Sequence, residues 1–525
     1  MFKLDDPLTH ATAIELSGML ARREISSEEL VRAHVDRIIT LDGRVSAFVE
    51  LLRGLALQEA KKTDDARARG ETLGPLAGLP VSVKENLDMV GRASTLGIIA
   101  RKGKLAQRDA AIVLALRRAG AIIVGRTNVP QLLLSHETRN PVFGVTNNPH
   151  SAKHTPGGSS GGEAAAIASG FSTLGVGTDI GGSIRVPAHF CGIAGLKPTL
   201  DRWSNRGSNG ALVGQEVVRS QTGPMARTVS DLAFFFGAID PLAMAVDDPL
   251  VAPVPVRDLA RIDVRKLRVG FFVDDGLIKP SLSVQHAIHQ SVKALEGAGV
   301  EVVPFVAPAI RDAVGCYLAA LASDGGKTAF RQLEGTTIES TLEPLRRAAA
   351  LSPTVRAGLC RALMALGQER VAWVLSLGGE KAIDELWQIT KRARDYRLLL
   401  IEAMQKLGVS AILCPAHATA ALPHGKGGQF LLAGSYSMLF NLVQFPAGVV
   451  PVGRVLESEA RRDPTGTDDR FERIAREVDS QSAGLPIGVQ LAAPPFHDEE
   501  VLALMLTLER ALAGSDRPKV PRAPA

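Results

Sequence analysis

The 525-residue sequence predicts an α/β fold in which one β-sheet carries a helical insertion. Two observations support this prediction. Short apolar strands alternate with amphipathic helices in two separate parts of the chain, and a later stretch contains almost only helix-forming residues. Length alone favours two to four domains, although large α/β enzymes often wrap a single sheet with this many residues. A composition that is 46% hydrophobic supplies enough apolar side chains for a large core.

The segment 1–75 is predicted to contain helices that pack on this core. Its clearest signal is the stretch ISSEELVRAHVDRII. Here Ser26 caps a helix, Glu29 reaches back to the cap, and Ile25 and Leu30 are placed as a hydrophobic staple. We assign this segment to the scaffold and not to the chemistry.

The segment 76–305 contains both alternations of strands and helices. The first runs through LPVSVKEN, AAIVLALRRAGA and IIVGRTN, and the second through LRVGFFV, VQHAIHQSVKALEGAG and VEVVPF. In the first strand, Val81 and Val83 are expected to face the core, whereas Ser82 and Lys84 share the opposite face. Most of the sheet is therefore predicted to lie in this segment.

The remaining chain is divided into a helical insertion, 306–400, and a C-terminal part of the core, 401–525. In the C-terminal part the strand pattern returns at VSAILCPA, FPAGVVPVG and GLPIGVQLAA. The polar residues 454–482, which separate the last two of these strands, are expected to form an excursion on the surface.

Charge and cysteine usage exclude several classes of function. The 60 basic and 55 acidic residues are spread along the chain without a basic arm, so no nucleic-acid partner is expected. The four cysteines lie too far apart for a zinc or redox motif, so we expect free thiols and no metal. The N-terminus lacks the pattern of a signal peptide, and no run reaches about 18 apolar residues. A cytoplasmic protein that is not secreted is therefore expected.

Two glycine-flanked serines mark the segment with the strongest chemical signal, which reads TPGGSSGGEAAAIASGFSTLGVGTDIGGSIRVPAHFCGIAGLKPT. Ser159 and Ser183 stand 24 residues apart around a predicted helix and strand. GGSSGG alone is typical of a turn or an anion-binding nest. A phosphate loop, however, has a lysine after its last glycine, and Glu163 stands there instead. The nucleotide-binding alternative is therefore disfavoured.

A serine becomes a nucleophile only when a base takes its proton. The nearby histidines, His150, His154 and His189, lie in no recognisable base motif. Lys84 is the better candidate, although a lysine at the end of a strand is most often simply solvated.

The segment 155–199, together with Lys84, resembles the amidase signature family, whose Ser-cisSer-Lys triad these positions match one by one. The resemblance implies a single large domain with a mixed, twisted β-sheet covered by helices on both faces. It also implies that Ser183 is the nucleophile and Lys84 the base. Ser159 is then the bridging serine, typically on a cis peptide bond. No cofactor is implied.

The chemistry of the residues fits these roles. Burial can lower the pKa of a lysine by several units, so that neutral Lys84 could draw a proton from Ser183 through Ser159. The same relay would return the proton to the leaving nitrogen. The backbone N–H groups that are expected to form the oxyanion hole belong to Ile180, Gly181, Gly182 and Ser183.

Three neighbouring residues are expected to hold the lysine, the loop and the backbone in place, namely Ser160, Asp179 and Arg185. For Arg185, an ordinary structural salt bridge is an equally good interpretation.

Further segments between residues 75 and 510 are similar to the fatty acid amide hydrolases of this family. Examples are VRSQTGPMARTVSDL, ASDGGKTAFRQLEG and GSYSMLFNLVQFPAGVVPVG. This similarity implies hydrolysis of lipophilic N-acyl amides to a fatty acid and an amine or ammonia, with Leu133 and Leu134 near the acyl entrance. The N-terminal membrane-spanning segment of the animal enzymes is not found here, so no stable membrane anchor is expected.

Other functions stay open at this point. One alternative is an amidase of smaller aryl or peptide amides, and another is the glutaminase subunit of an amidotransferase. A catalytically silent membrane-binding or scaffolding protein is disfavoured because Lys84, Ser159 and Ser183 are all present. A homodimer is compatible with the sequence, which does not determine the oligomeric state.

The stretch 345–379 raises the question of membrane contact. It contains five arginines and one acidic residue among leucines and Trp373; the arginines are Arg346, Arg347, Arg356, Arg361 and Arg370. A basic, leucine-rich helix with a tryptophan is typical of a segment that rests on an anionic bilayer. The apolar periodicity is imperfect, so a lid over the acyl pocket is an equally good interpretation.

Overall fold

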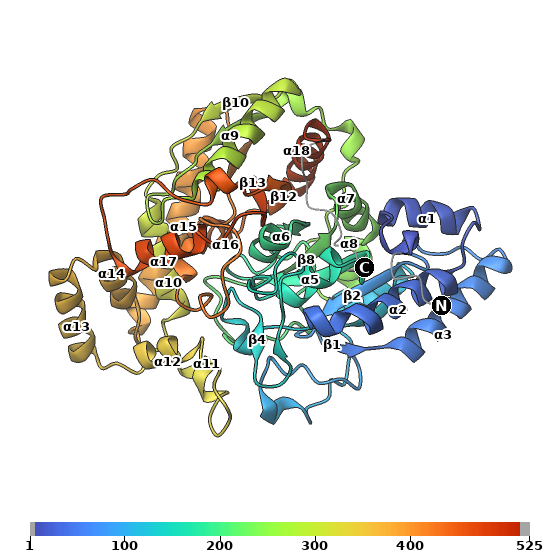
Figure 1. Ribbon diagram of the computed structural model, residues 1–525, viewed down its shortest axis with the longest axis horizontal. Helices are drawn as coiled ribbons and strands as arrows, with labels where there is room; N and C mark the ends of the chain where they lie inside the picture. The colour runs from blue at the N-terminus through green and yellow to red at the C-terminus, as the bar shows by residue number, and fades with distance from the viewer. Residues whose placement is uncertain (1–5, 515–525) are drawn as a thin grey trace.

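The computed structural model describes residues 6–514, and within them one mixed β-sheet of eleven strands forms the centre of the molecule (Figure 1). The order of the strands is β1-β3-β2-β6-β8-β7-β12-β13-β11-β9-β10. Their bounds are β1 Phe48–Leu51, β2 Pro80–Lys84, β3 Ile122–Thr127, β6 Leu174–Asp179, β7 Ala194–Lys197, β8 Gln221–Ala226, β9 Arg268–Phe271, β10 Glu301–Pro304, β11 Ala411–Pro415, β12 Ala447–Arg454 and β13 Pro486–Ala492. Two short strands, β4 Arg139–Asn140 and β5 Gly144–Val145, pair separately.

Both faces of the sheet are covered by helices. Strands β2, β3, β6, β8 and β13 are buried at every residue, which an open face would not allow. Neighbouring residues of β12 pack into different clusters: Val449 joins Ala164 and Ala188, whereas Val450 joins Leu504. The helices concerned are α5 Gly161–Ala168 and α6 Arg185–Cys191 on the first side and α18 Asp498–Ala511 on the second. The predicted α/β architecture is therefore confirmed.

The predicted alternations are present in both places. In the first, α4 Ala111–Arg118 connects β2 to the parallel strand β3, and in the second, α9 Leu282–Gly297 connects β9 to the parallel strand β10. The sheet is mixed because β8, β7, β12 and β13 pair antiparallel with their neighbours. Other helices of the core are α7 Val229–Ala238, α8 Pro241–Asp247 and α16 Ser435–Leu442.

The N-terminal segment contains α1 Ala13–Ala21, α2 Ser27–Val45 and α3 Arg53–Ala68. Ser26 and Glu29 form the predicted capping box of α2. The segment also contains a strand that was not predicted, since β1 pairs antiparallel with β3 and extends the sheet at this edge. Residues 1–5 and 515–525, which belong to the two outermost predicted segments, lie outside the described part of the chain.

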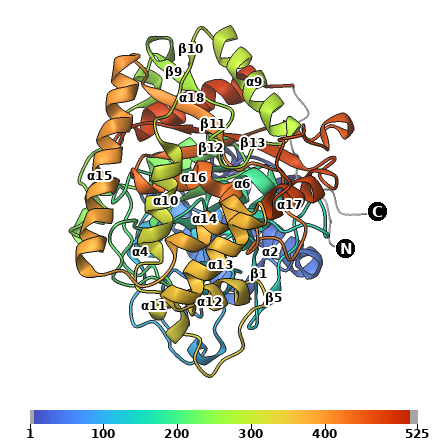
Figure 2. The same ribbon diagram turned by 90° about the vertical axis from the view of Figure 1, so that its left-hand side faces the viewer.

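The helical insertion forms one end of the molecule (Figures 1 and 2). Its helices are α10 Ile310–Leu321, α11 Lys327–Arg331, α12 Glu343–Ala349, α13 Pro353–Ala365, α14 Glu369–Leu377 and α15 Ile383–Lys406. Residues 454–482 are not only a surface excursion, since α17 Arg470–Asp479 lies among them. Phe471, Ile474 and Val478 are buried on one side of this amphipathic helix.

Among residues 6–514, no single helix is both long and apolar enough to cross a membrane, although α7 and α8 together pass that test as a bent pair. The described residues also contain no group of three or more His, Cys, Asp or Glu side chains that could hold a metal ion. All four cysteines are free thiols.

Candidate active site

Lys84 lies at the end of β2 with its side chain in the interior of the protein. Its Nζ atom donates to Ser159 Oγ at 2.7 Å, to Thr178 Oγ1 at 2.8 Å and to the carbonyl oxygen of Thr178 at 3.3 Å. Ser82 shares this face of the strand and is hydrogen-bonded to Glu163 of α5. The predicted alternation along β2 is thus correct, but α5 buries the polar face, so Lys84 is not solvated.

Burial sets the charge of this lysine. It lowers the pKa of Lys84 to about 7, against the opposing field of the carboxylates of Asp179, Glu163 and Glu85. Glu163 is itself fully buried, and burial raises the pKa of its carboxyl to about 7. At neutral pH a substantial fraction of Lys84 is therefore uncharged and able to accept a proton.

Ser159 and Ser160 directly precede helix α5. The Gly158–Ser159 peptide bond is cis. The N–H of Ser160 donates to the carbonyl oxygen of Ser183 at 3.0 Å, and its hydroxyl donates to the carbonyl oxygen of Thr178 at 3.3 Å. Ser160 thus connects the loop that carries Ser183 to the end of β6.

Ser183 follows Gly182, whose φ of +103° turns the chain sharply between β6 and α6. Its side chain lines the cavity and is 5% exposed. The hydroxyl of Ser183 forms no hydrogen bond within residues 6–514. The hydrogen bond between Lys84 and Ser159 is therefore present in the structure, whereas one between Ser183 and Ser159 is not. Catalytic hydrogen bonds are often long or absent in sites without substrate.

The backbone of residues 180–183 differs from the predicted oxyanion hole at one position. The N–H of Gly182 donates to Asp179 Oδ1 at 2.8 Å, so it is not free to bind a substrate oxygen. The other side of the same peptide group is also occupied, because the carbonyl oxygen of Gly181 lies 3.2 Å from His136 Nε2. Of the predicted donors, the N–H groups of Ile180, Gly181 and Ser183 have no acceptor among the described residues.

Asp179 and Arg185 form a buried ion pair beneath this loop. Both side chains are fully buried, and Arg185 donates to both carboxylate oxygens at 3.0 Å. The remaining guanidinium contacts are with Gln490 and Asn441. Burial opposes ionisation of Asp179, but the charge and hydrogen bonds of Arg185 hold its pKa well below the usual range. Arg185 is thus a structural partner of Asp179, which in turn holds the backbone of the loop.

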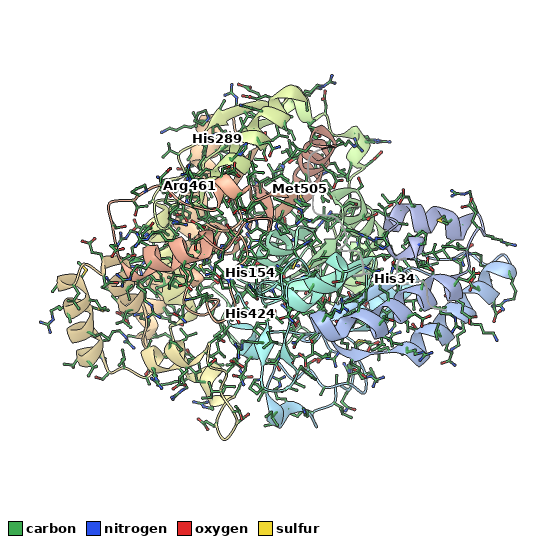
Figure 3. The ribbon with its side chains drawn as sticks, viewed as in Figure 1. His34, His154, His289, His424, Arg461 and Met505 are labelled. Atoms are coloured by element: carbon green, nitrogen blue, oxygen red, sulfur yellow. The ribbon has the colours of Figure 1, made fainter. Side chains whose placement is uncertain are left out.

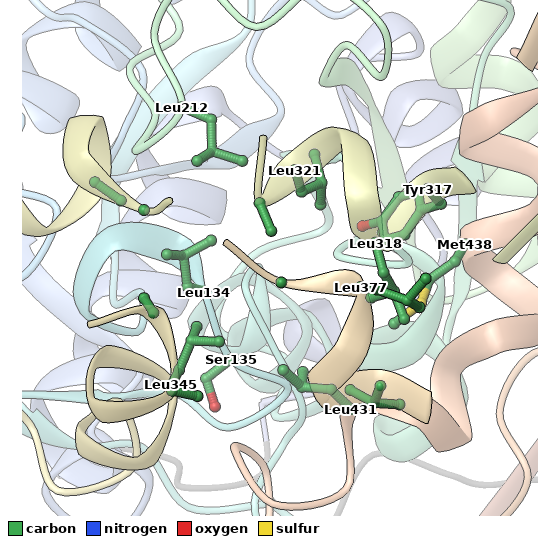
Figure 4. Close-up of a pocket in the computed structure, with 18 of the residues that line it drawn as sticks. Leu134, Ser135, Leu212, Tyr317, Leu318, Leu321, Leu345, Leu377, Leu431 and Met438 are labelled. Atoms are coloured by element: carbon green, nitrogen blue, oxygen red, sulfur yellow. The ribbon is translucent and has the colours of Figure 1, made fainter. Parts of the chain in front are cut away.

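An apolar cavity of about 350 Å³ opens beside Ser183 (Figure 4). Leu133 and Leu134, the residues predicted near the acyl entrance, line it. The insertion supplies much of the wall through α10, α12 and α14, which contribute Leu318, Leu345 and Val374 among others. A second cavity of about 420 Å³ lies next to it, shares Leu133, Leu134 and Ile180 with it, and is lined by polar residues such as Asn205 and Arg219.

The three histidines considered from the sequence have other partners. His150 lies 3.0 Å from the carbonyl oxygen of Cys191, and His189 contacts the carbonyl oxygens of Gly488 and Thr419. His154 Nδ1 lies 2.8 Å from the hydroxyl of Ser151, and Figure 3 shows His154 close to His424. None of the three contacts Ser159 or Ser183.

Sequence reasoning missed two side chains of the site, His136 and Tyr317. His136 contacts the carbonyl oxygen of Gly181, and Tyr317 packs against the Cα atom of the same glycine. His136 lies in SHETRN and Tyr317 in GCYLAAL, neither of which is a pattern with a known chemical meaning. Only the folded chain brings them to residues 180–183.

The chain is similar to known proteins in sequence and in fold. The family model described as Amidase matches residues 29–502. A fatty-acid amide hydrolase 1 from Sus scrofa is 37% identical over 449 residues, which cover 85% of this chain and 77% of the relative. One subunit of a glutamyl-tRNA(Gln) amidotransferase from Acidothermus cellulolyticus is 34% identical over 96% of this chain and 95% of the relative. A solved fatty acid amide hydrolase superposes with a TM-score of 0.85 at 28% identity, covering 96% of this chain and 86% of that structure.

Proposed function

The chain belongs to the amidase family, and from that premise we propose that it hydrolyses lipophilic N-acyl amides to a free acid and an amine or ammonia. It is an enzyme that acts on carboxylic amides. The observation that supports a lipophilic acyl group is the apolar cavity beside Ser183, because such a cavity binds an alkyl chain and offers little to a polar one.

In the proposed mechanism, neutral Lys84 accepts a proton from Ser159 while Ser159 accepts the proton of Ser183. The Ser183 oxygen attacks the amide carbonyl, and the resulting oxyanion binds to the free N–H groups of residues 180–183. When the C–N bond breaks, Ser159 returns the proton to the leaving nitrogen and is reprotonated by Lys84. Water then attacks the acyl-enzyme by the same relay, releasing the acid. The pKa of Lys84 near 7 suits both directions of this transfer.

The first test concerns the acyl chain. Along a series of N-acyl amides from acetyl to oleoyl, kcat/KM is expected to rise as the chain lengthens. Each methylene buried in an apolar cavity contributes up to about 0.8 kcal/mol, so four buried methylenes would give roughly a hundredfold increase. Steady-state hydrolysis of the series measures this slope directly.

Aryl amides and peptide amides serve as comparison substrates in that series. If either kind is hydrolysed with a higher kcat/KM than every long-chain amide, the proposed substrate class is wrong. The amide-hydrolysing chemistry would stand in that case, because it does not depend on the acyl group.

The second cavity, which shares Ile180 with the first, gives the amine a place with more polar groups, although leucine and valine side chains also line it. Its position next to the apolar cavity supports a substrate that lies across the site, with its acyl chain among leucines and its amine among Asn205, Arg219 and their neighbours. A substrate with one apolar and one polar end fits this arrangement.

The amidotransferase relative from Acidothermus cellulolyticus keeps a second function open. A glutaminase would bind a polar side chain beside the nucleophile, and the leucine-lined cavity does not favour one. Release of ammonia from glutamine at a rate above that from lipophilic amides would support this alternative.

We also propose that α13 rests on a membrane surface while α12 and α14 wall the cavity. Val355, Leu359 and Leu366 of this region are 55%, 42% and 73% exposed and lie on one face at helical spacing. Leu359 lines a shallow groove together with Ala348 and Leu375, which also line the apolar cavity. A lipophilic substrate could therefore pass from the bilayer to Ser183.

The arginines of 345–379 contribute less to such a contact than their number in the sequence suggests. Arg356 is buried and donates to the carbonyl oxygen of Leu351, and Arg370 forms two hydrogen bonds of 2.6 Å with Asp469. Arg346 and Arg347 pair with Glu343. Arg347 stays exposed despite this pairing, and Arg361 on α13 is exposed and forms no ion pair within residues 6–514. The apolar face is thus the better target for a test.

The double variant Leu359→Ser and Leu366→Ser is expected to bind anionic vesicles at least about tenfold more weakly, because it removes two apolar side chains from the proposed contact. Hydrolysis of a short, water-soluble amide should not change. A matched double variant, Val90→Ser and Val306→Ser, removes exposed valines elsewhere and should bind vesicles like the parent. Equal binding by both double variants in a vesicle sedimentation assay would exclude α13 as the membrane contact.

A further inference from the structure

Tyr317 differs from the other two tyrosines of the chain in the state of its hydroxyl group. Tyr396 donates to the carbonyl oxygen of Pro308 at 2.7 Å, and Tyr436 donates to that of Ile278 at 2.9 Å. The hydroxyl of Tyr317 has no hydrogen-bond partner within residues 6–514, although the residue is only 3% exposed. Tyrosine hydroxyls inside a protein usually find a partner. That of Tyr317 opens into the apolar cavity, so a molecule bound there can become its partner.

The hydroxyl lies at the point where the cavity meets the oxyanion loop. Tyr317 is part of α10 and lines the apolar cavity together with Gly181 and Ser183. Its Oη atom packs so closely on Gly181 that a Cβ atom at residue 181 would collide with it. Figure 4 shows this hydroxyl directed toward the cavity. The wall is mostly apolar, and the Tyr317 hydroxyl is one of its few polar groups, together with those of Ser135, His136 and Ser183.

The backbone supplies fewer donors here than a run of four N–H groups suggests. Asp179 accepts the N–H of Gly182, and His136 contacts the carbonyl oxygen on the other side of the same peptide group. The peptide group between Gly181 and Gly182 is therefore fixed at both ends and cannot turn its N–H toward the substrate. A side-chain donor next to Gly181 would take the place of this missing backbone donor.

We propose that the Tyr317 hydroxyl donates a hydrogen bond to the carbonyl oxygen of the substrate amide and acts as a side-chain member of the oxyanion hole. The proposal rests on the proposed function, in which Ser183 attacks that carbonyl. Burial raises the pKa of Tyr317, so the hydroxyl keeps its proton throughout the working range of the enzyme. It gains most when the oxygen becomes negative, since hydrogen bonds to charged groups are the stronger ones.

The variant Tyr317→Phe tests this proposal because it removes one oxygen and preserves the ring. We expect kcat to fall about 10- to 100-fold with little change in KM, since a donor of this kind acts mainly on the transition state. Tyr396→Phe is the matched control. It removes a hydroxyl from the neighbouring helix α15, where the group bonds only to Pro308, and should lower thermal stability without lowering kcat.

Inhibitor binding separates an oxyanion donor from a packing residue. A long-chain trifluoromethyl ketone forms an oxyanion on addition of the serine, whereas a primary alcohol of equal chain length does not. Tyr317→Phe should weaken binding of the ketone by the same factor as kcat/KM and leave binding of the alcohol unchanged. Equal losses for both ligands, or a kcat within twofold of the parent, would overturn the proposal.

The same experiment distinguishes failure of this proposal from failure of the proposed function. If Ser183 is not the nucleophile, the parent enzyme forms no adduct with the ketone, and the function itself is refuted. If short amides turn out to be preferred, the comparison is made with a short-chain ketone and alcohol. The role of Tyr317 is then decided independently of the acyl preference.

Discussion

Replacing Ser183 with alanine is expected to lower kcat by at least about 10⁴-fold and to abolish covalent labelling by a fluorophosphonate. The hydroxyl forms no hydrogen bond within residues 6–514, so its removal leaves no buried partner unsatisfied. The variant should therefore unfold at the temperature of the parent protein. Steady-state kinetics, intact-protein mass spectrometry after labelling and thermal unfolding measure the three quantities.

Ser169→Ala provides a matched control for this variant. Ser169 lies in the same glycine-rich segment, is also buried, and its hydroxyl likewise has no hydrogen-bond partner among the described residues. It does not line the apolar cavity, so its loss should change neither kcat nor labelling. Turnover by Ser183→Ala within about tenfold of the parent would remove Ser183 as the nucleophile.

The α/β fold could be predicted because many of its strands and helices show a local periodicity of apolar residues. The strand LPVSVKEN and the helix of AAIVLALRRAGA occur where their periodicity indicates, as β2 and α4. Two elements could not be recognised in this way. Strand β1 has only half-buried residues and gains its partner β3 more than 70 residues later, and α17 is hidden in a polar stretch because only one of its sides is apolar.

The candidate site was predictable where sequence motifs fix it and not where the fold does. Ser159, Ser183 and Lys84 stand in recognisable stretches, but the burial of Lys84 depends on α5, which follows it by about 77 residues. The N–H of Gly182 points away from the substrate because it donates to the carboxylate of Asp179. The glycines in the sequence do not indicate this direction. Likewise, Arg370 is neutralised by Asp469, a residue 99 positions away.

The second large effect is expected for Lys84→Met, which removes the proposed base and keeps most of its volume. We expect kcat/KM to fall by at least about 10³-fold. In the parent enzyme only neutral Lys84 is active, and its pKa lies near 7, so kcat/KM should rise with pH through about 7 and fall roughly tenfold per unit below it. In the variant this acid limb should be absent, because the residual reaction no longer depends on the lysine. Measurement of kcat/KM from pH 5 to 9 checks both expectations.

Lys197→Met decides whether the acid limb belongs to Lys84. Lys197 is the second buried lysine of the core, and burial also lowers its pKa to about 7. Its Nζ atom donates to the carbonyl oxygen of Pro198, and its side chain does not line the cavity. Both lysines titrate in the same range, but only Lys84 contacts Ser159, so Lys197→Met should keep the acid limb of the parent even if it unfolds at a different temperature. An acid limb that survives in Lys84→Met and disappears in Lys197→Met would assign the titration to Lys197. It would then refute the mechanism in which neutral Lys84 is the base.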